Sequence, residues 1–410
     1  MKNRFSALLL TILLIVLLNL NHIFAQTYSW SQLNDFSGSV RFGVFSFVID
    51  NYGYMGGGYA NGISVNDFWQ YNPANDNWTQ MSDCPLPVRA TGNFTLNGQG
   101  YVVCGLVNGS TIVGNVFAYD PVSNIWSAKN NFPGVAVYGG ASFEINGKGY
   151  YGVGNGGSAS GPYYTAFYEY NPVTDSWNQK APFPGNPRYG TFGLSISGMG
   201  YVGLGGDDGL NLNYNDWYQY DPISNNWTQK AFFTGSGRKY VAGFVLNDIG
   251  FVASGNIDSS TMANDFYNYD PIADAWTTLP NFSGIGRWAA TGFAIGDIGY
   301  FGTGQDGINY LRDFWKYSLD SSTSIDEIVL NDILIYPNPF LNSLTLISNQ
   351  FDSLESIDIV NTEGKFMISI PFYARNSNSY LIDMSKFSTG MYFIKMNFVN
   401  SIVTSKIFKL

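Results

Sequence analysis

Histidine is nearly absent from this sequence, and its absence limits the chemistry that the protein can perform. The single histidine, His22, lies before the predicted cleavage site of the export signal described below. The mature chain therefore has no imidazole to act as a general base or a metal ligand. Carboxylate, tyrosine, lysine and oxygen-ligand metal chemistry remain open.

Charged residues and long apolar runs are also scarce. Charged side chains make up 12% of the 410 residues, whereas aromatic side chains make up 17% and glycine occurs 47 times. This composition favours an all-β protein with many tight turns. Beyond the N-terminal segment, no run reaches the ~18 apolar residues of a spanning helix, so we expect no membrane span. The net charge of −10, without a basic stripe, argues against nucleic acid as a partner.

The N-terminus has the layout of a secretory signal peptide. Lys2 and Arg4 precede an apolar run from Ala7 to Leu18, and Ala25 ends the segment. This pattern predicts a signal peptide over residues 1–25, cleaved near Ala25. We therefore expect an exported protein.

A motif recurs along most of the chain with a period near 50 residues. Each copy begins with Tyr in Y-[ND]-P and has Trp seven residues later. The tyrosines are Tyr71, Tyr119, Tyr170, Tyr220 and Tyr269, and the tryptophans are Trp78, Trp126, Trp177, Trp227 and Trp276. Short strands around Asn/Asp/Gly turns precede each copy. A repeat of this length and content predicts the blades of a β-propeller.

The two ends of the repeat region complement each other. Trp30 stands 48 residues before Trp78 with no repeat strands before it, whereas residues 292–317 supply three strands with no Trp after them. We predict that the N-terminal strand completes the last blade. The prediction for residues 26–319 is therefore a six-bladed propeller closed by an N-terminal outer strand, which leaves no free sheet edge.

The repeat resembles the kelch family. Its elements are Arg, then N-G-x-G-Y-V, a Gly-rich segment, N-D-[FW]-[WY]-x-Y-[ND]-P and x-W-[TS], and they extend over residues 28–318. The resemblance implies a kelch-type β-propeller. Kelch-like propellers include copper oxidases and sialic-acid mutarotases, but both involve histidine, so neither activity carries over. We expect no copper site, and a histidine-independent carbohydrate-active enzyme stays an alternative.

The last part of the chain has a different pattern. A polar linker is predicted at residues 320–332, and residues 333–410 alternate apolar and polar residues between turns, as in a small Ig-like β-sandwich. Tyr336 to Pro339, the turn at Glu363 to Lys365 and Ser388 to Tyr392 resemble the C-terminal sorting domain of the type IX secretion system. The resemblance implies delivery by that machinery across the outer membrane of a Gram-negative bacterium, then surface attachment or release.

Arginines and aromatic residues recur just before the inner strands. Arg41, Arg89, Arg188, Arg238 and Arg287 stand eight or nine residues before an inner-strand turn, and several precede an aromatic residue. We expect them to surround one mouth of the channel, where variable loops emerge. The predicted ligand-binding residues are Arg188, Tyr189, Arg287, Trp288, Tyr163, Tyr164, Asp207 and Asp208. In the alternative, the arginines bridge neighbouring blades.

Two further interpretations stay open. Asp207, Asp208 and Asp306 offer oxygen ligands for Ca²⁺, although ordinary Asp-Gly turns explain the same residues and no full ligand set is visible. We therefore assign no metal or cofactor. Cys84 and Cys104, the two cysteines of the chain, either form a disulfide or remain separate buried thiols.

These observations favour an exported, non-catalytic binding or adhesion protein that presents its propeller to a glycan or a protein. Two alternatives remain: the histidine-independent enzyme named above, and a structural scaffold of a surface assembly. A scaffold differs from the other two in having no small ligand.

Overall fold

The computed structural model describes residues 28–319 except 109 and 259, and residues 333–409 except 337, 339, 348–352, 362–363, 372–378 and 400. The chain divides into two compact units, one of which is Gln26–Leu319; the other contains Asp320–Leu410. The predicted signal peptide and linker lie outside the described residues.

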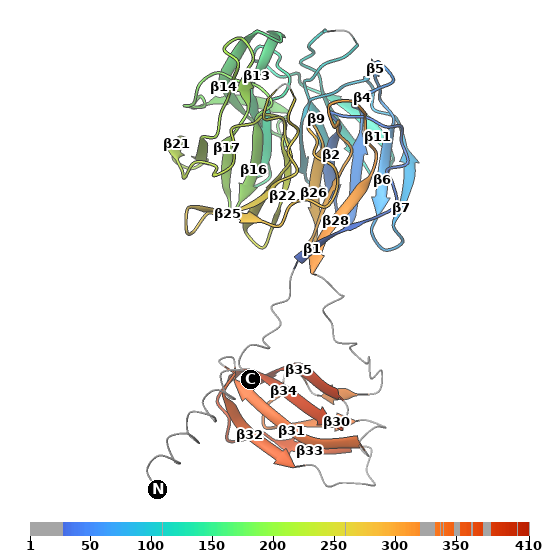
Figure 1. Cartoon of the computed structure of the whole chain (residues 1–410), viewed down its shortest axis with the longest axis vertical. Helices are drawn as coiled ribbons and strands as arrows, with labels where there is room; N and C mark the ends of the chain where they lie inside the picture. Colours follow the sequence, from blue (N-terminus) through green and yellow to red (C-terminus); the bar gives the residue numbers. More distant parts are fainter. Residues whose placement is uncertain are drawn as a thin grey trace, which may run out of the picture. The chain divides into compact units, whose positions relative to one another are not determined.

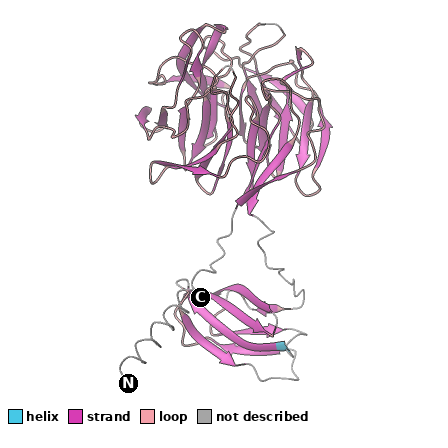
Figure 2. Ribbon diagram, in the orientation of Figure 1, coloured by secondary structure: helices cyan, strands magenta, loops and turns pink. Residues whose placement is uncertain are grey.

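Residues 28–319 form six four-stranded antiparallel sheets, which we number as blades in chain order (Figures 1 and 2). The strands, from the innermost outward, are β2 (Phe45–Ile49), β3 (Tyr52–Gly56), β6 (Phe68–Asn72) and β7 (Asn77–Met81); β8 (Gly92–Leu96), β9 (Gln99–Val103), β10 (Val116–Asp120) and β11 (Ile125–Lys129); β12 (Ala141–Ile145), β13 (Lys148–Ser158), β14 (Gly161–Asn171) and β15 (Ser176–Lys180); β16 (Phe192–Ile196), β17 (Met199–Gly203), β20 (Trp217–Asp221) and β21 (Asn226–Gln229); β22 (Ala242–Leu246), β23 (Ile249–Ala253), β24 (Phe266–Asp270) and β25 (Ala275–Leu279); β26 (Thr291–Ile295), β27 (Ile298–Gly302), β28 (Phe314–Leu319) and β1 (Tyr28–Gln32). The innermost strands contact one another in cyclic order, and β26 contacts β2.

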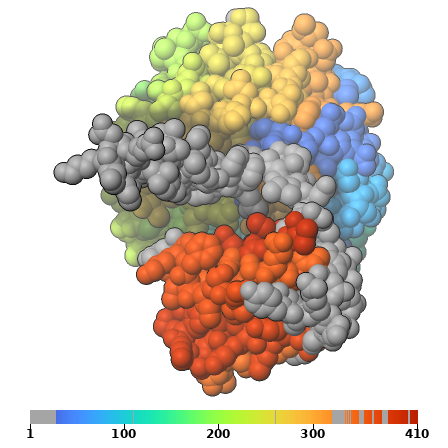
Figure 3. Space-filling view, turned by 60° about the horizontal axis from the view of Figure 1, so that its bottom comes forward, coloured from blue at the N-terminus to red at the C-terminus, as the bar shows by residue number. Residues whose placement is uncertain are grey.

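The last blade is completed by the first strand of the chain. β1 pairs antiparallel with β28, with Trp30 opposite Tyr317. In the space-filling view the blue first blade lies directly beside the orange last blade (Figure 3). The prediction of an all-β propeller closed by its N-terminal strand is confirmed.

Neighbouring blades interlock through a glycine in the second strand. An added Cβ at Gly100 of β9 would overlap the ring of Phe47 in β2, and one at Gly149 of β13 would overlap Phe94 in β8. The N-G-x-G-Y motif therefore has its second glycine because the phenylalanine of the preceding blade fills that space.

The repeated Tyr and Trp link outer strands to the preceding blade, through an Asp or Asn in all five copies of the motif and through Trp Nε1 in every copy except that of Trp78. In blade 4, Tyr220 donates to Asn225 Oδ1 at 2.8 Å, and the same oxygen accepts from the backbone N–H of Ala181 at 3.0 Å. Trp227 Nε1 donates to the carbonyl of Ala181 at 3.0 Å. In the other four copies of the motif, the Asp or Asn side chain likewise accepts from the Tyr hydroxyl and from a backbone N–H of the preceding blade. Asp76 accepts from the N–H of Asn34, Asn124 from Ser82, Asp175 from Asn130 and Asp274 from Ala231.

The spliced blade departs from this arrangement in a compensating way. Two residues before Trp30 the chain has Tyr28 where the other blades have Asp or Asn. Pro280 lies four residues after Trp276, at the position that Ala181 occupies after Trp177. Unlike Ala181, it has no N–H to donate. The missing acceptor therefore leaves no backbone donor unsatisfied at this junction.

The propeller also has two small hairpins, and the C-terminal unit contains two sheets. The hairpins are β4 (Tyr59–Ala60) with β5 (Ile63–Ser64), and β18 (Gly206–Asp207) with β19 (Leu212–Asn213). In the C-terminal unit, one sheet has β29 (Leu334–Tyr336), β30 (Ser343–Ile347) and β33 (Ser379–Asp383), and the other has β32 (Phe366–Pro371), β31 (Leu354–Asn361), β34 (Gly390–Phe398) and β35 (Ser401–Lys409). Leu344 and Ile382 from the first sheet pack with Ile357 and Ile394 from the second, which makes the predicted β-sandwich.

Candidate ligand-binding site at the channel mouth

One residue from each blade contributes to a ring of backbone hydrogen bonds around the channel. We call these residues the channel ring: Gly43, Ala90, Gly139, Gly190, Tyr240 and Ala289. The bonds are Ala90 N to Gly43 O (3.0 Å), Gly139 N to Ala90 O (2.9 Å), Thr191 N to Gly139 O (3.2 Å), Tyr240 N to Gly190 O (2.8 Å), Ala289 N to Tyr240 O (2.9 Å) and Gly43 N to Ala289 O (2.8 Å). All six residues have a positive φ, between 50° and 69°. Glycine adopts this conformation without strain, whereas a bulky tyrosine rarely does.

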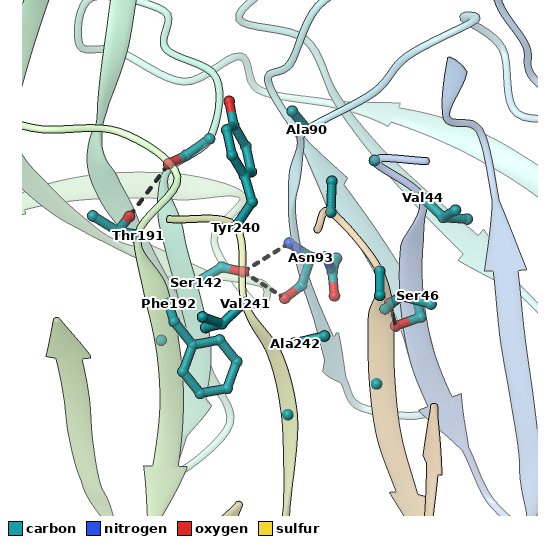
Figure 4. A pocket seen from close by; sticks show the side chains of 18 of the residues that line it. Val44, Ser46, Ala90, Asn93, Ser142, Thr191, Phe192, Tyr240, Val241 and Ala242 are labelled. Carbon is teal, nitrogen blue, oxygen red and sulfur yellow. Dashed lines mark hydrogen bonds between the residues drawn. The ribbon is translucent and has the colours of Figure 1, made fainter. Parts of the chain in front are cut away.

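On one side of the channel ring lies a cavity of about 200 Å³, lined by small polar side chains of the inner strands. Ser46 and Thr291 share a hydrogen bond of 2.5 Å, and Ser142 Oγ donates to the carbonyl of Asn93 and accepts from its N–H, each at 3.0 Å. Figure 4 shows the ring of Tyr240 turned away from Ser142 and Asn93. The hydroxyl groups of this cavity thus largely satisfy one another and the backbone.

On the other side lies a larger pocket of about 500 Å³, which we call the channel-mouth pocket. Each of the six blades contributes one residue to the lining of this pocket. The six residues occupy equivalent positions, and each forms a β-bridge to a loop of its own blade. In chain order these residues are Phe42, Arg89, Tyr138, Tyr189, Lys239 and Trp288. The loops between second and third strands surround them, as expected for a binding surface.

Aromatic rings in contact run along this lining. Trp288 lies 5.2 Å from Phe42 and 5.3 Å from Tyr240, and Tyr240 lies 5.5 Å from Tyr189, which lies 5.8 Å from Tyr138 (distances between ring centroids). Tyr59, Tyr163 and Tyr310 pack behind these rings. Tyr138 and Tyr189 are buried at 8% and 6% exposure, whereas Phe42, Tyr240 and Trp288 are half-buried residues.

Two cations and one carboxylate belong to the same lining. The guanidinium of Arg89 lies 4.3 Å from the ring centre of Tyr59, and its Nη1 donates to Ser64 Oγ at 2.9 Å. Burial lowers the pKa of Arg89, which still leaves it protonated at neutral pH. Across the pocket, Lys239 forms an ion pair with Asp208.

Tyr189 completes the group formed by Lys239 and Asp208. Its hydroxyl donates to Asp208 Oδ2 and accepts from Lys239 Nζ at 3.2 Å. Burial, then the neighbouring Tyr240 and the bond to Asp208, raise the pKa of Tyr189 well above its ordinary value. The phenol therefore stays protonated, so it acts as a hydrogen-bond donor and not as a base.

The structure contradicts the predicted placement of Arg188 and Arg287 at the channel mouth. Both side chains are 0% exposed. Arg188 pairs through both terminal nitrogens with Asp216, and Arg287 pairs in the same way with Asp313 at 2.6 and 2.7 Å. Each carboxylate belongs to the arginine's own blade, so the arginines do not bridge two blades through these pairs. They hold the entering connection against the second-to-third-strand loop.

Arg89 belongs to a different position from the other four arginines. Val88 occupies the buried position in blade 2, and Arg89, one residue later, faces the pocket. The sequence contained a signal for this difference, because Arg89 stands eight residues before its turn at Asn97, whereas Arg188 stands nine before Ser197. Sequence reasoning also missed Lys239 and Tyr240, which lie one and two residues after a buried arginine.

The remaining predicted residues divide between the pocket and other places. Tyr189, Trp288 and Asp208 line it, and Tyr163 stacks on Tyr189 at 5.5 Å and accepts from the N–H of Asp208 at 3.1 Å. Tyr164 is wrongly predicted, because neighbours in a strand point to opposite faces and it packs against the apolar cluster of blades 2 and 3.

Asp207 and the other loop carboxylates form local bonds. Asp207 Oδ1 accepts from the N–H of Leu210 at 3.1 Å, and Asp306 Oδ1 accepts from the N–H of Ile308 at 2.8 Å. Among the described residues, no three His, Cys, Asp or Glu side chains gather in a way that would hold a metal. These bonds are those of ordinary Asx turns.

The disulfide interpretation is wrong. Cys84 and Cys104 are both free thiols, buried in different apolar clusters. Burial raises the pKa of each to about 12. They pack as small apolar side chains.

Comparisons with known proteins agree with this architecture. Residues 334–409 match the family model of the secretion system C-terminal sorting domain. A segment of 114 residues is 28% identical to an F-box/kelch-repeat protein of Arabidopsis thaliana, and it covers 28% of this chain and 30% of that protein. The solved structure of YjhT superimposes with a TM-score of 0.60 at 15% identity, over 69% of this chain and 96% of that one. The last likeness concerns the fold alone.

The resemblances to kelch-repeat propellers and to the sorting domain are therefore confirmed. The sorting domain indicates secretion through its machinery, to the cell surface or the medium. Within the described part of the chain there is no helix with the length and apolar character needed to cross a membrane.

Proposed function

We propose that this chain is an exported, non-catalytic glycan-binding protein whose ligand occupies the channel-mouth pocket. The sorting domain delivers the propeller to the cell surface or the medium, where glycans are accessible partners. The volume of about 500 Å³ lies within the range of about 300–1,000 Å³ that small-molecule sites occupy.

The aromatic lining carries this proposal. Phe42, Trp288 and Tyr240 are half-buried, and the ring of Trp288 contacts both of the others. Sugar rings have apolar C–H faces, which lose contact with water when they lie against such rings. Gln305 and Asn256, also in the lining, supply polar groups for sugar hydroxyls.

The polar groups of the pocket favour binding over acid–base catalysis. Asp208 is held by Lys239 and Tyr189, and Tyr189 keeps its proton. A general base needs a carboxylate oxygen within reach of the substrate's proton, whereas both oxygens of Asp208 already accept hydrogen bonds, one from Lys239 and one from Tyr189. The group therefore serves to orient a ligand.

A glycan array probed with the mature chain tests the proposal. We expect binding to a defined subset of glycans, and loss of that binding in Trp288→Ala. Phe232→Ala is the matched control, because Phe232 is 54% exposed and lies outside the pocket. A blank array, or equal loss of binding in both variants, would contradict the proposed function.

A further inference from the structure

The channel-mouth pocket rests directly on the channel ring. In every blade, the residue that lines the pocket immediately precedes the channel-ring residue, as Lys239 precedes Tyr240 and Trp288 precedes Ala289. The pocket and the inner cavity share four lining residues, and all four belong to the channel ring: Gly43, Ala90, Tyr240 and Ala289. The channel ring is therefore the boundary between the two spaces, and it forms the base of the pocket.

The side chain of Tyr240 closes much of this base. It is the one side chain larger than a methyl group among the six channel-ring residues. A Cβ added at Gly190 would lie 3.0 Å from Cδ2 of Tyr240, and one added at Gly139 would lie 3.2 Å from its hydroxyl oxygen. The side chain thus extends from blade 5 past blade 4 to blade 3, and the cavity beyond it has a volume of about 200 Å³. A glycan chain that enters the pocket cannot continue through the channel.

Asn256 offers a hydrogen-bond acceptor at the level of the base. It lies directly opposite Lys239 in an antiparallel bridge, lines the pocket and is 9% exposed. Its Nδ2 donates to the carbonyl of Asp258 at 2.6 Å and to Met262 Sδ at 3.4 Å. Because a carbonyl can accept but not donate, these bonds fix which end of the amide is the nitrogen. Oδ1 accepts no hydrogen bond from any described residue, so it is available to a ligand.

Gln305 offers a second amide beside Trp288. The two residues form the equivalent bridge in blade 6, with a backbone hydrogen bond of 3.0 Å in each direction. Residues directly opposite each other in an antiparallel pair have their side chains on the same face. Gln305 is half-buried, and within the described part of the chain its side-chain amide makes no hydrogen bond. An amide both donates and accepts, which suits a hydroxyl group of a sugar that lies on Trp288.

The end of a glycan chain fits these features of the pocket. An internal sugar is linked on both sides, and a pocket with a closed base provides an exit for one linkage alone. A terminal sugar also has one free hydroxyl more than the same sugar inside a chain, and a buried acceptor such as Asn256 Oδ1 needs a donor. Glycans on proteins and lipids are attached through their reducing end, so the non-reducing end is the one that can enter.

We propose that the channel-mouth pocket binds the non-reducing terminal pyranose of a glycan chain, with its apolar face on Trp288 and one free hydroxyl donating to Asn256 Oδ1. Gln305 binds a further hydroxyl, and the rest of the chain leaves through the mouth of the pocket. This inference rests on the proposed glycan-binding function and adds which part of a glycan is bound. The closed base and the unpaired acceptor support it independently.

A glycan array of matched pairs, probed with the mature chain, tests the binding of a chain end. Each pair consists of one glycan and the same glycan extended at its non-reducing end by one sugar of another kind. We expect extension of a bound glycan to weaken binding at least about tenfold, because the extended sugar no longer fits above the closed base. Equal binding of extended and unextended glycans would overturn the inference and leave the glycan-binding function standing. A blank array would overturn both.

Calorimetric titration with monodeoxy analogues of the terminal sugar tests the contact to Asn256. Loss of the hydroxyl that donates to Oδ1 should weaken binding to the wild-type chain about tenfold, because the acceptor is then left without a partner. In Asn256→Ala the same deoxygenation should cost nothing, whereas deoxygenation elsewhere on the sugar should cost as much as in the wild type. If the losses for every analogue are the same in both proteins, the inference is wrong.

Gln305→Ala provides a second variant, which should fold normally because its amide holds no other described part of the chain. We expect it to bind the terminal sugar about tenfold more weakly. The matched control is Gln179→Ala, because Gln179 is an exposed glutamine of β15 outside the pocket. It should leave binding unchanged. Equal loss of binding in both variants, or in neither, would overturn the inference.

Discussion

Tyr240 and Ala289 occupy the same position in adjacent blades, and a hydrogen bond of 2.9 Å joins the N–H of Ala289 to the carbonyl of Tyr240. Both have a left-handed backbone, with φ of 55° and 50°. The tyrosine keeps this conformation although it is the bulkiest member of the channel ring, and backbone strain of this kind is commonly found at functional sites. Its ring adjoins Tyr189 and Trp288 in the pocket lining.

Tyr240→Ala should therefore preserve the fold and open the base of the pocket. Ala90 and Ala289 already show that alanine is accepted at this position. We expect sugar binding to weaken by about 1–3 kcal/mol, as for loss of an aromatic anchor, with a much smaller change in the melting temperature. Calorimetric titration and thermal unfolding measure the two effects, and global unfolding of the variant would contradict this prediction.

Trp288→Ala should mainly weaken binding, whereas Trp227→Ala should mainly lower stability. Trp227 packs against the apolar core between blades 3 and 4 and donates to Ala181, so we expect its loss to cost about 3–5 kcal/mol of stability. Trp288 lines the pocket, so its removal should chiefly reduce binding. Equilibrium unfolding of both variants decides the matter, and equal destabilisation would show that Trp288 is a packing residue.

Asn225→Ala should destabilise the propeller without touching the pocket. The substitution leaves the N–H of Ala181 and the hydroxyl of Tyr220 without their acceptor, at a cost of about 1–3 kcal/mol. Asn225→Asp is the control, because Asp76, Asp175 and Asp274 serve at equivalent positions. In denaturant unfolding, the free energy of unfolding of Asn225→Asp should be close to that of the wild type.

Deletion of residues 28–36 should lower thermal stability sharply. The deletion removes β1 and exposes the edge of β28, and it leaves the core around Phe266, Phe282 and Tyr317 without Trp30. An exposed edge also promotes association between copies. Scanning calorimetry and light scattering provide the measurements, and an unchanged transition would disprove the closure.

Acid should weaken the propeller through its buried arginine pairs. Burial opposes ionisation of Asp313, but the hydrogen bonds and charge of Arg287, with Trp315, outweigh it and lower the pKa of Asp313. A carboxyl whose folded pKa lies below its unfolded value stabilises the fold above the unfolded value, about 3.9, and loses this contribution as pH falls through the folded pKa. The melting temperature should therefore fall steeply below about pH 4, and less steeply in the Arg287→Met, Asp313→Leu double variant.

The fold could be predicted from the sequence because each copy of the repeat contains the residues that hold its blade in place. Tyr220 bonds to Asn225, and Asn225 and Trp227 both bond to Ala181 of the preceding blade. The same short motif therefore marks each blade and its junction with the blade before it. Trp30 also revealed the closure, because an outer strand without inner strands needs a partner. One departure from the repeat was understood only from the structure. The chain has no Asp or Asn two residues before Trp30, and Pro280 lacks the N–H from which such a side chain would accept a hydrogen bond.

The site was less accessible to sequence reasoning, since it depends on which way side chains point. Arg188 and Tyr189 are adjacent, yet one is buried against Asp216 and the other faces the pocket. Arg89 faces the pocket, as Tyr189 does, because the arginine of blade 2 stands one residue later than in the other blades. Side chains alternate between the two faces of an extended chain, so a shift of one residue moves a side chain to the other face. Tyr163 and Tyr164 differ for the same reason.

The pairing of β1 with β28 also governs when the chain can finish folding. Tyr28 is opposite Leu319, so the last blade forms after almost the whole propeller sequence has been made. Any shorter nascent chain has an incomplete blade and an open ring, and long-range pairings of this kind form slowly. The residues that close the propeller are directly followed by the C-terminal unit. A chain that ends before Phe314 therefore cannot close its ring, because β1 then has no partner strand.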